Sequence, residues 1–579
     1  MNSDYTKKSE VACYPSIDRP WLKYYTDSAR NAKMPQLTMY KYIYNINRNF
    51  PKDIALEFYG RKISYKDFFV MVDHCAESLY SLGIKKGDIV TVQSITIPQV
   101  IVLIYALNKI GACGNMIYPD VKPLEIYRTI VETNSKAFFV LENIYSSYES
   151  EIKCKLCENI IVMKVSDEMN AIAQIVSSAK NKCQIKSKNG LISWKSFMRN
   201  RGQQVVENTD PFLPAFMVYT GGSTGKPKAV VLSSYGINSV VEQYKLTDIE
   251  FIRGKTNLNV LPPFIAFGIN IGIHLPISTG IKTVISLSSS SEDAYKSFYK
   301  YKPNYYITGA AYLENIINNC HHDIDLSFVN VIAMGGDFLS LSQEKRINLF
   351  LEKHHSHVKL IKGYGMSETS GTTITETSSC HKAGTVGIPL PLVNVKIVDS
   401  DTNVELPLGY EGELCISTPS TMVGYYKIDS NETIEPHNDG VKWVHTGDVA
   451  TLDENGYVTI IGRIKRIITV IYKGTYHKVF PKILEEKFQS IRGLSEIVIV
   501  GRNCPDTQNE LVAFIVPDPN IQNSMFEDVL RNYAENNLEI YERPVEYRFV
   551  NDLPKTLIGK IDFRAIEKAA EIDFDELNR

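Results

Sequence analysis

Helical and strand-like segments alternate between residues 63 and 139, and few architectures accommodate such an alternation. Helices are expected where apolar residues recur at helical spacing, and strands where short apolar runs stand between turn residues. The expected order is a helix over Tyr65–Leu82 ending at Gly83, a strand over Asp88–Gln93, a buried helix over Val100–Ile110, a helix over Pro123–Thr133 and a strand over Ala137–Leu141. This order predicts a largely parallel sheet that is covered by helices on both faces.

The same pattern returns further along the chain, after a polar stretch. Ser177–Asn208 is expected to be an insertion or a surface loop, because polar residues dominate it and no periodicity is visible. Further strands are expected over Pro214–Tyr219, Asn257–Leu261, Lys282–Ser286, Tyr305–Thr308, Asn330–Met334 and Val358–Lys362.

The pattern changes after about Gly440, where glycine and asparagine separate short strands as far as Gly462. The remaining chain suffices for a small α+β domain of roughly 110 residues. We place the boundary just after Arg463, which divides the chain into residues 1–463 and residues 464–579. The small domain is expected to hold helices over Lys482–Gln489 and Asn523–Asn536, and strands over Glu496–Val500, Leu511–Val516 and Val545–Val550.

Length and composition exclude several classes of protein. A chain of 579 residues is too long for one core at roughly 150 residues per domain. The 63 basic and 65 acidic side chains nearly cancel, which argues against a nucleic-acid partner bound by bulk charge. No signal peptide is visible, and the longest apolar run, Val100–Leu107, is too short to span a membrane. Ten cysteines are too few for a disulfide scaffold, so a cytoplasmic location is expected.

A glycine-rich segment, Tyr219–Lys228, begins at the end of an apolar strand. Glycines let backbone N–H groups converge on phosphate oxygens, hydroxyls add donors and lysines neutralise charge. The segment is not a Walker A loop, because Pro227 follows Lys226 and no glycine stands five residues before Gly225. Two other interpretations stay open, a plain glycine-rich turn and a hydrolase nucleophile elbow around Ser223, although Pro227 suits the helix of an elbow poorly.

A second segment, Gly363–Thr369, also follows an expected strand. Its glycines are expected to put Tyr364 and Glu368 on an exposed turn at the end of the strand, where α/β proteins place ligands. A flat aromatic ring there can stack on a purine, and a carboxylate can hold Mg²⁺ beside phosphates. A turn with a solvated glutamate is the alternative.

Three shorter segments are weak when each is taken alone. Asp448, in Thr446–Asp448, can accept hydrogen bonds from a ribose diol, and Arg463 can donate to ribose or phosphate. Lys560, in Leu553–Lys560, can meet a reacting phosphate if a turn on a mobile domain holds it. Surface turns and solvated charges are the alternative for all three.

Taken in this order, the five segments resemble those of the adenylate-forming superfamily. Its members include acyl- and aryl-CoA ligases, firefly luciferase and the adenylation domains of peptide synthetases. The resemblance extends from Gly111 to Arg564. It implies a large N-terminal domain of helix-covered β-sheets with a small distorted β-barrel part, and a small mobile C-terminal α+β domain. It also implies that a carboxylic acid attacks ATP to give an acyl adenylate and pyrophosphate, before a thiol takes the acyl group.

The resemblance implies a role for each matching residue. Lys560, Glu368 and Thr224 would be catalytic, with Glu368 and Thr224 at the Mg²⁺ ion. Tyr364 would stack on adenine beside Gly335, Gly336 and Asp337, Ser367 would contact the α-phosphate, and Asp448 would bind the ribose with Arg463 beside it. The ATP site would comprise Thr220, Gly222, Ser223, Thr224, Gly225, Lys228, Gly336, Asp337, Tyr364, Gly365, Ser367, Asp448 and Arg463.

The residues of the acid pocket and of the thiol site match the family less closely. Ile265 stands where many ligases have a histidine, and no aspartate is placed to hold an α-ammonium group, so a fatty or aromatic acid is preferred over an amino acid. Lys465 would be the hinge, and Gly474 would approach the thiol channel after the small domain rotates. The expected pocket residues are Phe264, Ile265, Phe267, Gly268, Ala310 and Gly336.

Several functions stay open. Coenzyme A is the favoured thiol, and the phosphopantetheine of a carrier protein is the close alternative. The hydrolase interpretation predicts that Ser223→Ala abolishes turnover and that ATP is irrelevant. A non-catalytic nucleotide-binding relative is disfavoured because Glu368, Asp448 and Lys560 are all present.

Overall fold

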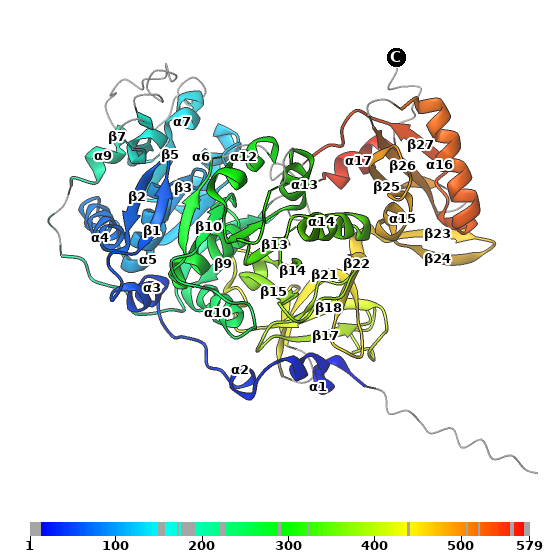
Figure 1. The fold of residues 1–579 in the computed structure, drawn as a ribbon, viewed down its shortest axis with the longest axis horizontal. Helices are drawn as coiled ribbons and strands as arrows, with labels where there is room; N and C mark the ends of the chain where they lie inside the picture. The colour runs from blue at the N-terminus through cyan, green and yellow to red at the C-terminus, as the bar shows by residue number, and fades with distance from the viewer. Residues whose placement is uncertain are drawn as a thin grey trace, which may run out of the picture.

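The computed structural model describes most of the chain. The described residues are 13–148, 157–170, 173–174, 191–200, 202, 204–220, 227–287, 291–320, 324–336, 339–436, 440–504, 508–518, 521–555 and 561–571. Figure 1 shows a large body built on β-sheets and a smaller lobe formed by the C-terminal part. No helix within these residues is long and apolar enough to cross a membrane.

The first sheet has eight strands in the order β19-β9-β8-β4-β3-β5-β6-β7. Strands β3 to β8 pair in parallel, whereas β9 and β19 are antiparallel additions at one edge. The strands are β3 (Ile89–Gln93), β4 (Cys113–Ile117), β5 (Ala137–Leu141), β6 (Asn159–Met163), β7 (Leu191–Ser193), β8 (Pro214–Thr220), β9 (Lys228–Ser233) and β19 (Gly424–Tyr425).

The second sheet has nine strands in the order β16-β15-β14-β13-β12-β10-β11-β1-β2, and its centre is parallel. The strands are β1 (Ile54–Phe58), β2 (Arg61–Ser64), β10 (Thr256–Asn259), β11 (Lys282–Ile285), β12 (Tyr305–Thr308), β13 (Val331–Gly335), β14 (Leu360–Met366), β15 (Gly371–Thr375) and β16 (Ile388–Pro389).

Helices cover these sheets (Figure 1), and one of them, α5 (Pro98–Ile110), is almost entirely buried. Nearly every side chain of α5 is buried, so it belongs to the shared core and has no solvent face. Pro98 starts it, and Gly111 ends it in the left-handed conformation at φ 76°. The other helices of this part are α1 (Pro15–Asp18), α2 (Asp27–Arg30), α3 (Met39–Asn47), α4 (Tyr65–Ser81), α6 (Pro123–Thr133), α7 (Glu142–Tyr148), α9 (Trp194–Phe197), α10 (Ser234–Lys245), α11 (Leu275–Ser278), α12 (Ser291–Tyr301), α13 (Ala310–Asn318) and α14 (Leu341–Lys353), with the π-helix η3 (Gly268–His274).

A third sheet contains β17 (Asn394–Val398), β18 (Gly412–Ser417), β21 (Lys442–Leu452), β20 (Ile434–Pro436) and β22 (Val458–Arg463). It corrects the expected barrel, because in the part of the chain that is described these five strands form an open sheet. The expected loop over Ser177–Asn208 is also corrected. Part of it lies outside the described residues, but β7 and α9 occupy its second half, and Trp194 and Phe197 are buried.

The C-terminal part has its own core. A hairpin of β23 (Ile468–Tyr472) and β24 (Thr475–Val479) precedes a three-stranded sheet, and it turns through Lys473 and Gly474, which both have positive φ. A two-residue turn with positive φ at both residues has a backbone twist that matches the twist of the two strands it joins. Figure 1 shows this hairpin pointing away from the large body. The sheet contains β25 (Leu494–Cys504), β26 (Gln508–Pro517) and β27 (Glu546–Phe549), and the helices are α15 (Pro481–Phe488), α16 (Asn523–Asn537) and α17 (Phe563–Ala570).

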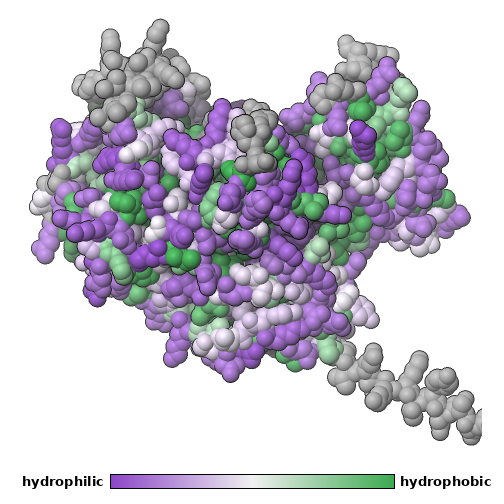
Figure 2. Space-filling model, viewed as in Figure 1, coloured by the Kyte–Doolittle hydropathy of each residue, from purple (hydrophilic) through white to green (hydrophobic). Residues whose placement is uncertain are grey.

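The predicted fold class is confirmed, as a large part of helix-covered sheets is followed by a smaller α+β part. Figure 2 shows polar side chains over most of the visible face, with apolar ones singly or in small groups. This surface agrees with a folded chain in which 22% of the residues are charged.

Candidate functional site

The second and third sheets meet at Tyr364, Asp448 and Arg463. The hydroxyl of Tyr364, in β14, donates to Oδ2 of Asp448, in β21, over 2.5 Å. Nε of Arg463 lies 2.7 Å from Oδ1 of Asp448, and the two residues are direct partners between β21 and β22. Asp448 is 4% exposed, and both of its oxygens bind polar or charged partners, although the Arg463 side chain itself is largely exposed. Three of the predicted site residues are therefore brought together.

A bend in β21 directs the Asp448 side chain to this point. Gly447 has a φ of 68°, a conformation that suits glycine, and its N–H donates to Oε1 of Glu413 over 2.9 Å. The hydroxyl of Thr446 donates to the carbonyl oxygen of Leu414 over 2.8 Å and accepts the Asp448 N–H over 3.1 Å. The Thr-Gly-Asp pattern is thus a local structure that fixes one carboxylate.

Tyr364 is held as a neutral phenol. Burial raises its pKa well above the usual value, and the neighbouring Asp448 carboxylate raises it further. Tyr364 lies within strand β14 and is half-buried, and Glu368 in the next turn is 6% exposed. The expectation of an exposed turn is therefore wrong, because β14 continues to Met366 by pairing with β15.

The flanks of the glycine-rich segment lie beside Glu368. Thr220 ends β8, Lys228 starts β9, and the two are direct cross-strand partners. The Lys228 ammonium lies 4.7 Å from the ring centre of Tyr425, and the Tyr425 hydroxyl donates to Oε1 of Glu368 over 2.9 Å. Tyr425 therefore contacts Lys228 through its ring and Glu368 through its hydroxyl, although these two residues are far apart in the chain.

Glu368 suits a magnesium ion. Its Oε1 accepts the hydrogen bond from Tyr425, whereas Oε2 has no hydrogen-bond donor among the described residues. A buried carboxylate with one free oxygen has the oxygen chemistry that Mg²⁺ prefers. Thr224, the other predicted ligand, lies outside the described residues, as do Gly222, Ser223, Gly225, Asp337 and Lys560.

Glycines leave the backbone around Tyr364 without side chains at two positions. A side chain at Gly365 would lie 2.0 Å from the carbonyl oxygen of Gly371, so only glycine fits there. Gly336 has a φ of 81° at the end of β13, with open space around it. Ser367 begins the short 3-10 turn that carries Glu368. Of these two glycines, Gly336 borders open space, at the end of a strand where α/β proteins place ligands.

Comparisons with known proteins identify the family. The AMP-binding enzyme family matches residues 44–426, and the AMP-binding enzyme C-terminal domain matches residues 484–560. The chain belongs to the AMP-binding enzymes. This membership confirms the resemblance to adenylate-forming enzymes.

Relatives and solved structures of this family cover nearly the whole chain. A long-chain-fatty-acid–CoA ligase of Bacillus subtilis is 26% identical over 560 residues, which are 94% of this chain and 96% of the relative. A 4-coumarate–CoA ligase-like protein of Arabidopsis thaliana is 25% identical over 512 residues, 86% of this chain and 87% of the relative. The crystal structure of an anthranilate CoA ligase with anthranoyl-AMP has a TM-score of 0.77, 19% identity, and coverage of 93% and 98%.

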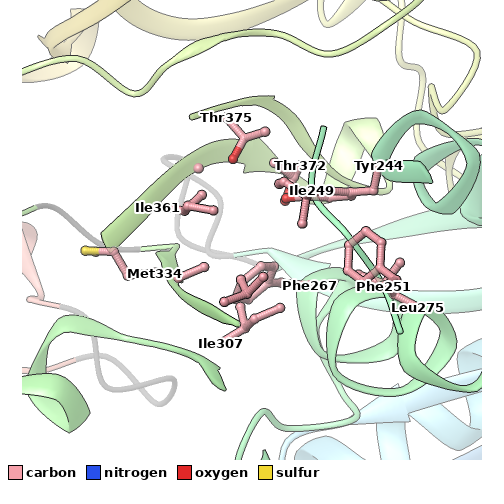
Figure 3. Close-up of a pocket in the computed structure, with 13 residues that line it drawn as sticks. Tyr244, Ile249, Phe251, Phe267, Leu275, Ile307, Met334, Ile361, Thr372 and Thr375 are labelled. Atoms are coloured by element: carbon pink, nitrogen blue, oxygen red, sulfur yellow. The ribbon is translucent and has the colours of Figure 1, made fainter. Parts of the chain in front are cut away.

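An apolar cavity of this AMP-binding enzyme lies next to the Tyr364 site, between the second sheet and the segments that cover it (Figure 3). Of the expected acid-pocket residues, Phe267 lines it. Phe264 instead packs edge-on against Tyr118 at 4.9 Å, and Ala310 lies in the core beneath α13. The lining residues are Tyr244, Ile249, Phe251, Phe267, Leu275, Ile307, Val331, Ala333, Met334, Ile361, Gly363, Thr372 and Thr375.

The other expected pocket residues adjoin this lining. Ile265 packs against the main core, and Gly268 begins η3. A side chain at Gly268 would meet the carbonyl oxygen of Pro262 at 1.6 Å, so glycine lets this turn pack closely. Gly336 follows Gly335, whose Cβ position lies 3.2 Å from the Phe267 ring.

Sequence reasoning missed Tyr425, Tyr244, Thr372 and Thr375. Each comes from a segment without a recognisable motif; strand pairing brings Tyr425, Thr372 and Thr375 to the site, and Tyr244 comes from helix α10. Lys465, the predicted hinge, lies in the short 3-10 turn just after β22. Gly474 lies at the tip of the β23–β24 hairpin, and a side chain there would meet nothing within 4 Å.

Proposed function

We propose that this chain activates a carboxylic acid with ATP, which gives an acyl adenylate and pyrophosphate, and transfers the acyl group to the thiol of coenzyme A. One observation carries the proposal. Tyr364 and Arg463 each contact Asp448, and the buried Glu368, four residues after Tyr364, is linked through Tyr425 to Lys228 at the flank of the glycine-rich segment. This cluster suits a nucleotide, and the CoA ligases among the relatives support the acid and the thiol.

Different residues would bind different parts of the nucleotide. The Tyr364 ring would stack on adenine at the bare glycines, and Asp448 would exchange its present partners for the ribose hydroxyls. Lys228 and the glycine-rich residues would hold the β- and γ-phosphates, and Ser367 the α-phosphate. Glu368 and Thr224 would hold Mg²⁺, which offsets phosphate charge when bound. The buried Glu368 carboxylate and the Lys228 ammonium would bind these charged groups effectively, because charges interact strongly where water is excluded.

The small C-terminal part would supply Lys560 for adenylation. Two anions, the acid and the α-phosphate, must approach each other, and a lysine between them offsets their repulsion. We propose a domain of residues 1–463 and a mobile one of 464–579, joined at Lys465. In the present arrangement Gly474 lies on a hairpin directed away from the large body (Figure 1). A rotation at Lys465 would remove Lys560 and bring Gly474 to the thiol.

The test supplies Mg-ATP and a pooled panel of fatty, aryl and amino acids, with and without coenzyme A, and identifies products by mass spectrometry. An acyl-CoA is expected. An acyl adenylate that persists with coenzyme A would instead favour a carrier-protein phosphopantetheine as the acceptor. The absence of any ATP-dependent product would contradict the proposal. The cytoplasmic location that the cysteine content suggests stays a prediction.

The variant Lys560→Ala tests whether Lys560 acts in adenylation alone. It is expected to slow adenylation by at least about a hundredfold, the usual effect of removing a positioned electrostatic group. Acyl transfer from a supplied acyl adenylate to coenzyme A should stay within about threefold, since the lysine acts only in the first step. Lys555→Ala, on the same segment, is the control, because its ammonium pairs with the exposed Asp552 at 3.0 Å. Equal losses in both half-reactions would contradict the proposed role of Lys560.

A further inference from the structure

A cysteine, a histidine and a glutamate lie together on one face of the third sheet. Cys415 in β18 and His445 in β21 are direct cross-strand partners, and Glu413 precedes Cys415 by two residues on the same strand. Alternate residues of a strand point to the same face of a sheet. Two neighbouring strands therefore bring a thiol, an imidazole ring and a carboxylate to one place.

The ligand atoms of these three side chains are spaced for one metal ion. Sγ of Cys415 lies 3.6 Å from Nδ1 and 3.9 Å from Nε2 of His445, and Nδ1 lies 2.9 Å from Oε2 of Glu413. One ligand atom from each residue lies within 4.8 Å of the other two. Zn²⁺ binds such atoms at about 2.0–2.3 Å in a tetrahedron, whose corners are then about 3.3–3.8 Å apart. A modest turn of the imidazole ring would direct Nδ1 at an ion between the three.

The other ring nitrogen of His445 already has a carboxylate partner. Its Nε2 lies 2.8 Å from Oε1 of Glu435, and this oxygen also accepts a hydrogen bond from Nδ2 of Asn403 over 3.0 Å. A histidine that binds a metal through one nitrogen almost always donates the other N–H to a carboxylate, a carbonyl or water, which fixes the tautomer and the ring. Glu435 supplies that partner, so Nδ1 is the nitrogen that faces the thiol and Glu413.

Glu413 can bind an ion without releasing the backbone. Its Oε1 accepts the Gly447 N–H over 2.9 Å, whereas Oε2 faces His445. The pairing of β18 with β21 shifts register just here, and such irregularities re-aim side chains. An ion on Oε2 would therefore brace the bend at Gly447, which directs Asp448, without touching the nucleotide.

Negative charge is in excess around the thiol. Cys415 is fully buried, and the charged side chains that act on it in the described part of the chain are those of Glu413, Lys396, Glu435 and Glu405. The three carboxylates outnumber the ammonium, and they still do so when the imidazole is counted as a cation. Buried charge costs free energy unless an opposite charge compensates it. A divalent cation would supply that compensation and stabilise the thiolate.

We propose that Cys415, His445 and Glu413 bind one Zn²⁺ ion, with water in the fourth position. A thiolate with an imidazole favours Zn²⁺ over Mg²⁺ and Ca²⁺, which prefer oxygen ligands. Binding replaces the thiol proton, which is released to solvent. The ion links β18 to β21 and is distinct from the Mg²⁺ expected at Glu368. The proposal is independent of the proposed function, because it concerns the stability of the bend and no step of catalysis.

The experiment titrates Zn²⁺ into the full chain after treatment with EDTA and removal of the chelator. Calorimetry is expected to show binding with a dissociation constant at or below about 1 μM. Co²⁺ in place of Zn²⁺ should give the visible bands of a tetrahedral site together with a thiolate charge-transfer band. The absence of Zn²⁺ binding, or a Co²⁺ spectrum without the thiolate band, would overturn the proposal. The EDTA-treated chain is also the form in which His445 titrates without a competing ion.

Two variants locate the ion. Cys415→Ala should weaken Zn²⁺ binding by at least about a hundredfold, and Glu435→Ala by about tenfold, since partners of a ligating histidine contribute about 10–100-fold to affinity. Cys75→Ala is the matched control, because Cys75 is equally buried but lies in α4, in the main apolar core. Zn²⁺ should raise the Tm of the native chain and of Cys75→Ala, and leave that of Cys415→Ala unchanged. Equal Zn²⁺ affinity in Cys415→Ala and the native chain would place the ion elsewhere and overturn the assignment.

Discussion

Asp448 binds two partners before any nucleotide is present. Tyr364 and Arg463 each occupy one of its oxygens, and the carboxylate is nearly inaccessible to water. A diol that replaces the Tyr364 hydroxyl therefore exchanges one hydrogen bond for another, and the carboxylate stays satisfied throughout. The cluster holds the Asp448 carboxylate in one orientation, ready for the proposed contact with ribose.

The variant Tyr364→Phe separates the ring from its hydroxyl. It removes the hydrogen bond to Asp448 and keeps the flat surface, so KM for ATP should change by no more than about fivefold. Tyr364→Ala removes the ring as well and should raise KM for ATP by at least about tenfold, since base stacking on an aromatic side chain is worth about 1–3 kcal/mol. ATP-dependent pyrophosphate release measures both. Similar losses in the two variants would refute the adenine-stacking role.

His445 makes this region sensitive to pH. Its Nδ1 lies 2.9 Å from Glu413, which also holds Gly447, and its Nε2 lies 2.8 Å from Glu435. The hydrogen bond with Glu413 raises the pKa of His445, and the charge of Glu435 adds to this, whereas burial and the Lys396 ammonium lower it. The stabilising contribution is therefore complete below pH about 6.5, the usual value for an unfolded chain, and is lost as the pH rises through the raised value.

Urea unfolding from pH 6 to pH 9 measures this contribution. The free energy of unfolding of the native chain should fall across the range relative to that of His445→Gln, which lacks the titrating group. The contribution of His274 to stability depends on pH in the opposite direction, because complete burial lowers its pKa to about 3. Its contribution is complete above about pH 6.5 and is lost as the pH falls, so it serves as an internal contrast. Parallel curves for the native chain and His445→Gln would contradict the prediction.

At the scale of elements, the sequence predicted some of the helices and strands, those whose local signals are strong, and left others such as α10 and α14 unassigned. Helix α4 has Ser64 as its N-cap, whose side chain accepts the N–H of Asp67, and the predicted and observed bounds differ by one residue. β7 and α9 were missed because three and four residues are too few to show a period. β14 extends beyond its predicted end because β15 pairs with it, and sequence alone does not show that pairing.

Gly268 is an element boundary that tolerates no side chain. The variant Gly268→Ala would place Cβ 1.6 Å from the carbonyl oxygen of Pro262, so either the backbone or η3 must shift. A loss of at least about 2 kcal/mol in the free energy of unfolding is expected, as in other overpacked cores. Gly309→Ala is the control, because Gly309 has ordinary backbone angles and open space around it. Thermal unfolding measures both, and equal Tm values would contradict the close packing.

At the scale of the whole molecule, the site was predictable only in part. Tyr364, Glu368, Asp448 and Arg463 belong to motifs whose residue types suit a nucleotide, so the sequence alone predicted them as site residues, and the structure brings Tyr364, Asp448 and Arg463 together. The hydrogen bond between Glu368 and Tyr425, in contrast, joins segments that are far apart in the chain. Such contacts depend on sheet pairing, which a single sequence does not reveal.

The small C-terminal part contacts the large one near Lys482, at the start of α15. Its ammonium donates to the carbonyl oxygen of Ile460, in β22, over 2.7 Å, and burial lowers its pKa. This contact lies close to Lys465, so it would move little if the lobe rotated about that residue. The remainder of the lobe, including the β23–β24 hairpin, would travel furthest (Figure 1).

The variant Lys465→Pro tests the rotation. Proline fixes φ near −65° and should prevent the backbone change that a hinge requires. Adenylation in the present arrangement should stay within about threefold, whereas acyl transfer to coenzyme A should slow by at least about tenfold, since that step needs the rotated lobe. Pyrophosphate release and acyl-CoA formation separate the two, and Lys465→Ala controls for loss of the ammonium. Unchanged transfer in Lys465→Pro would place the hinge elsewhere, and equal loss in Lys465→Ala would assign the effect to the lost charge.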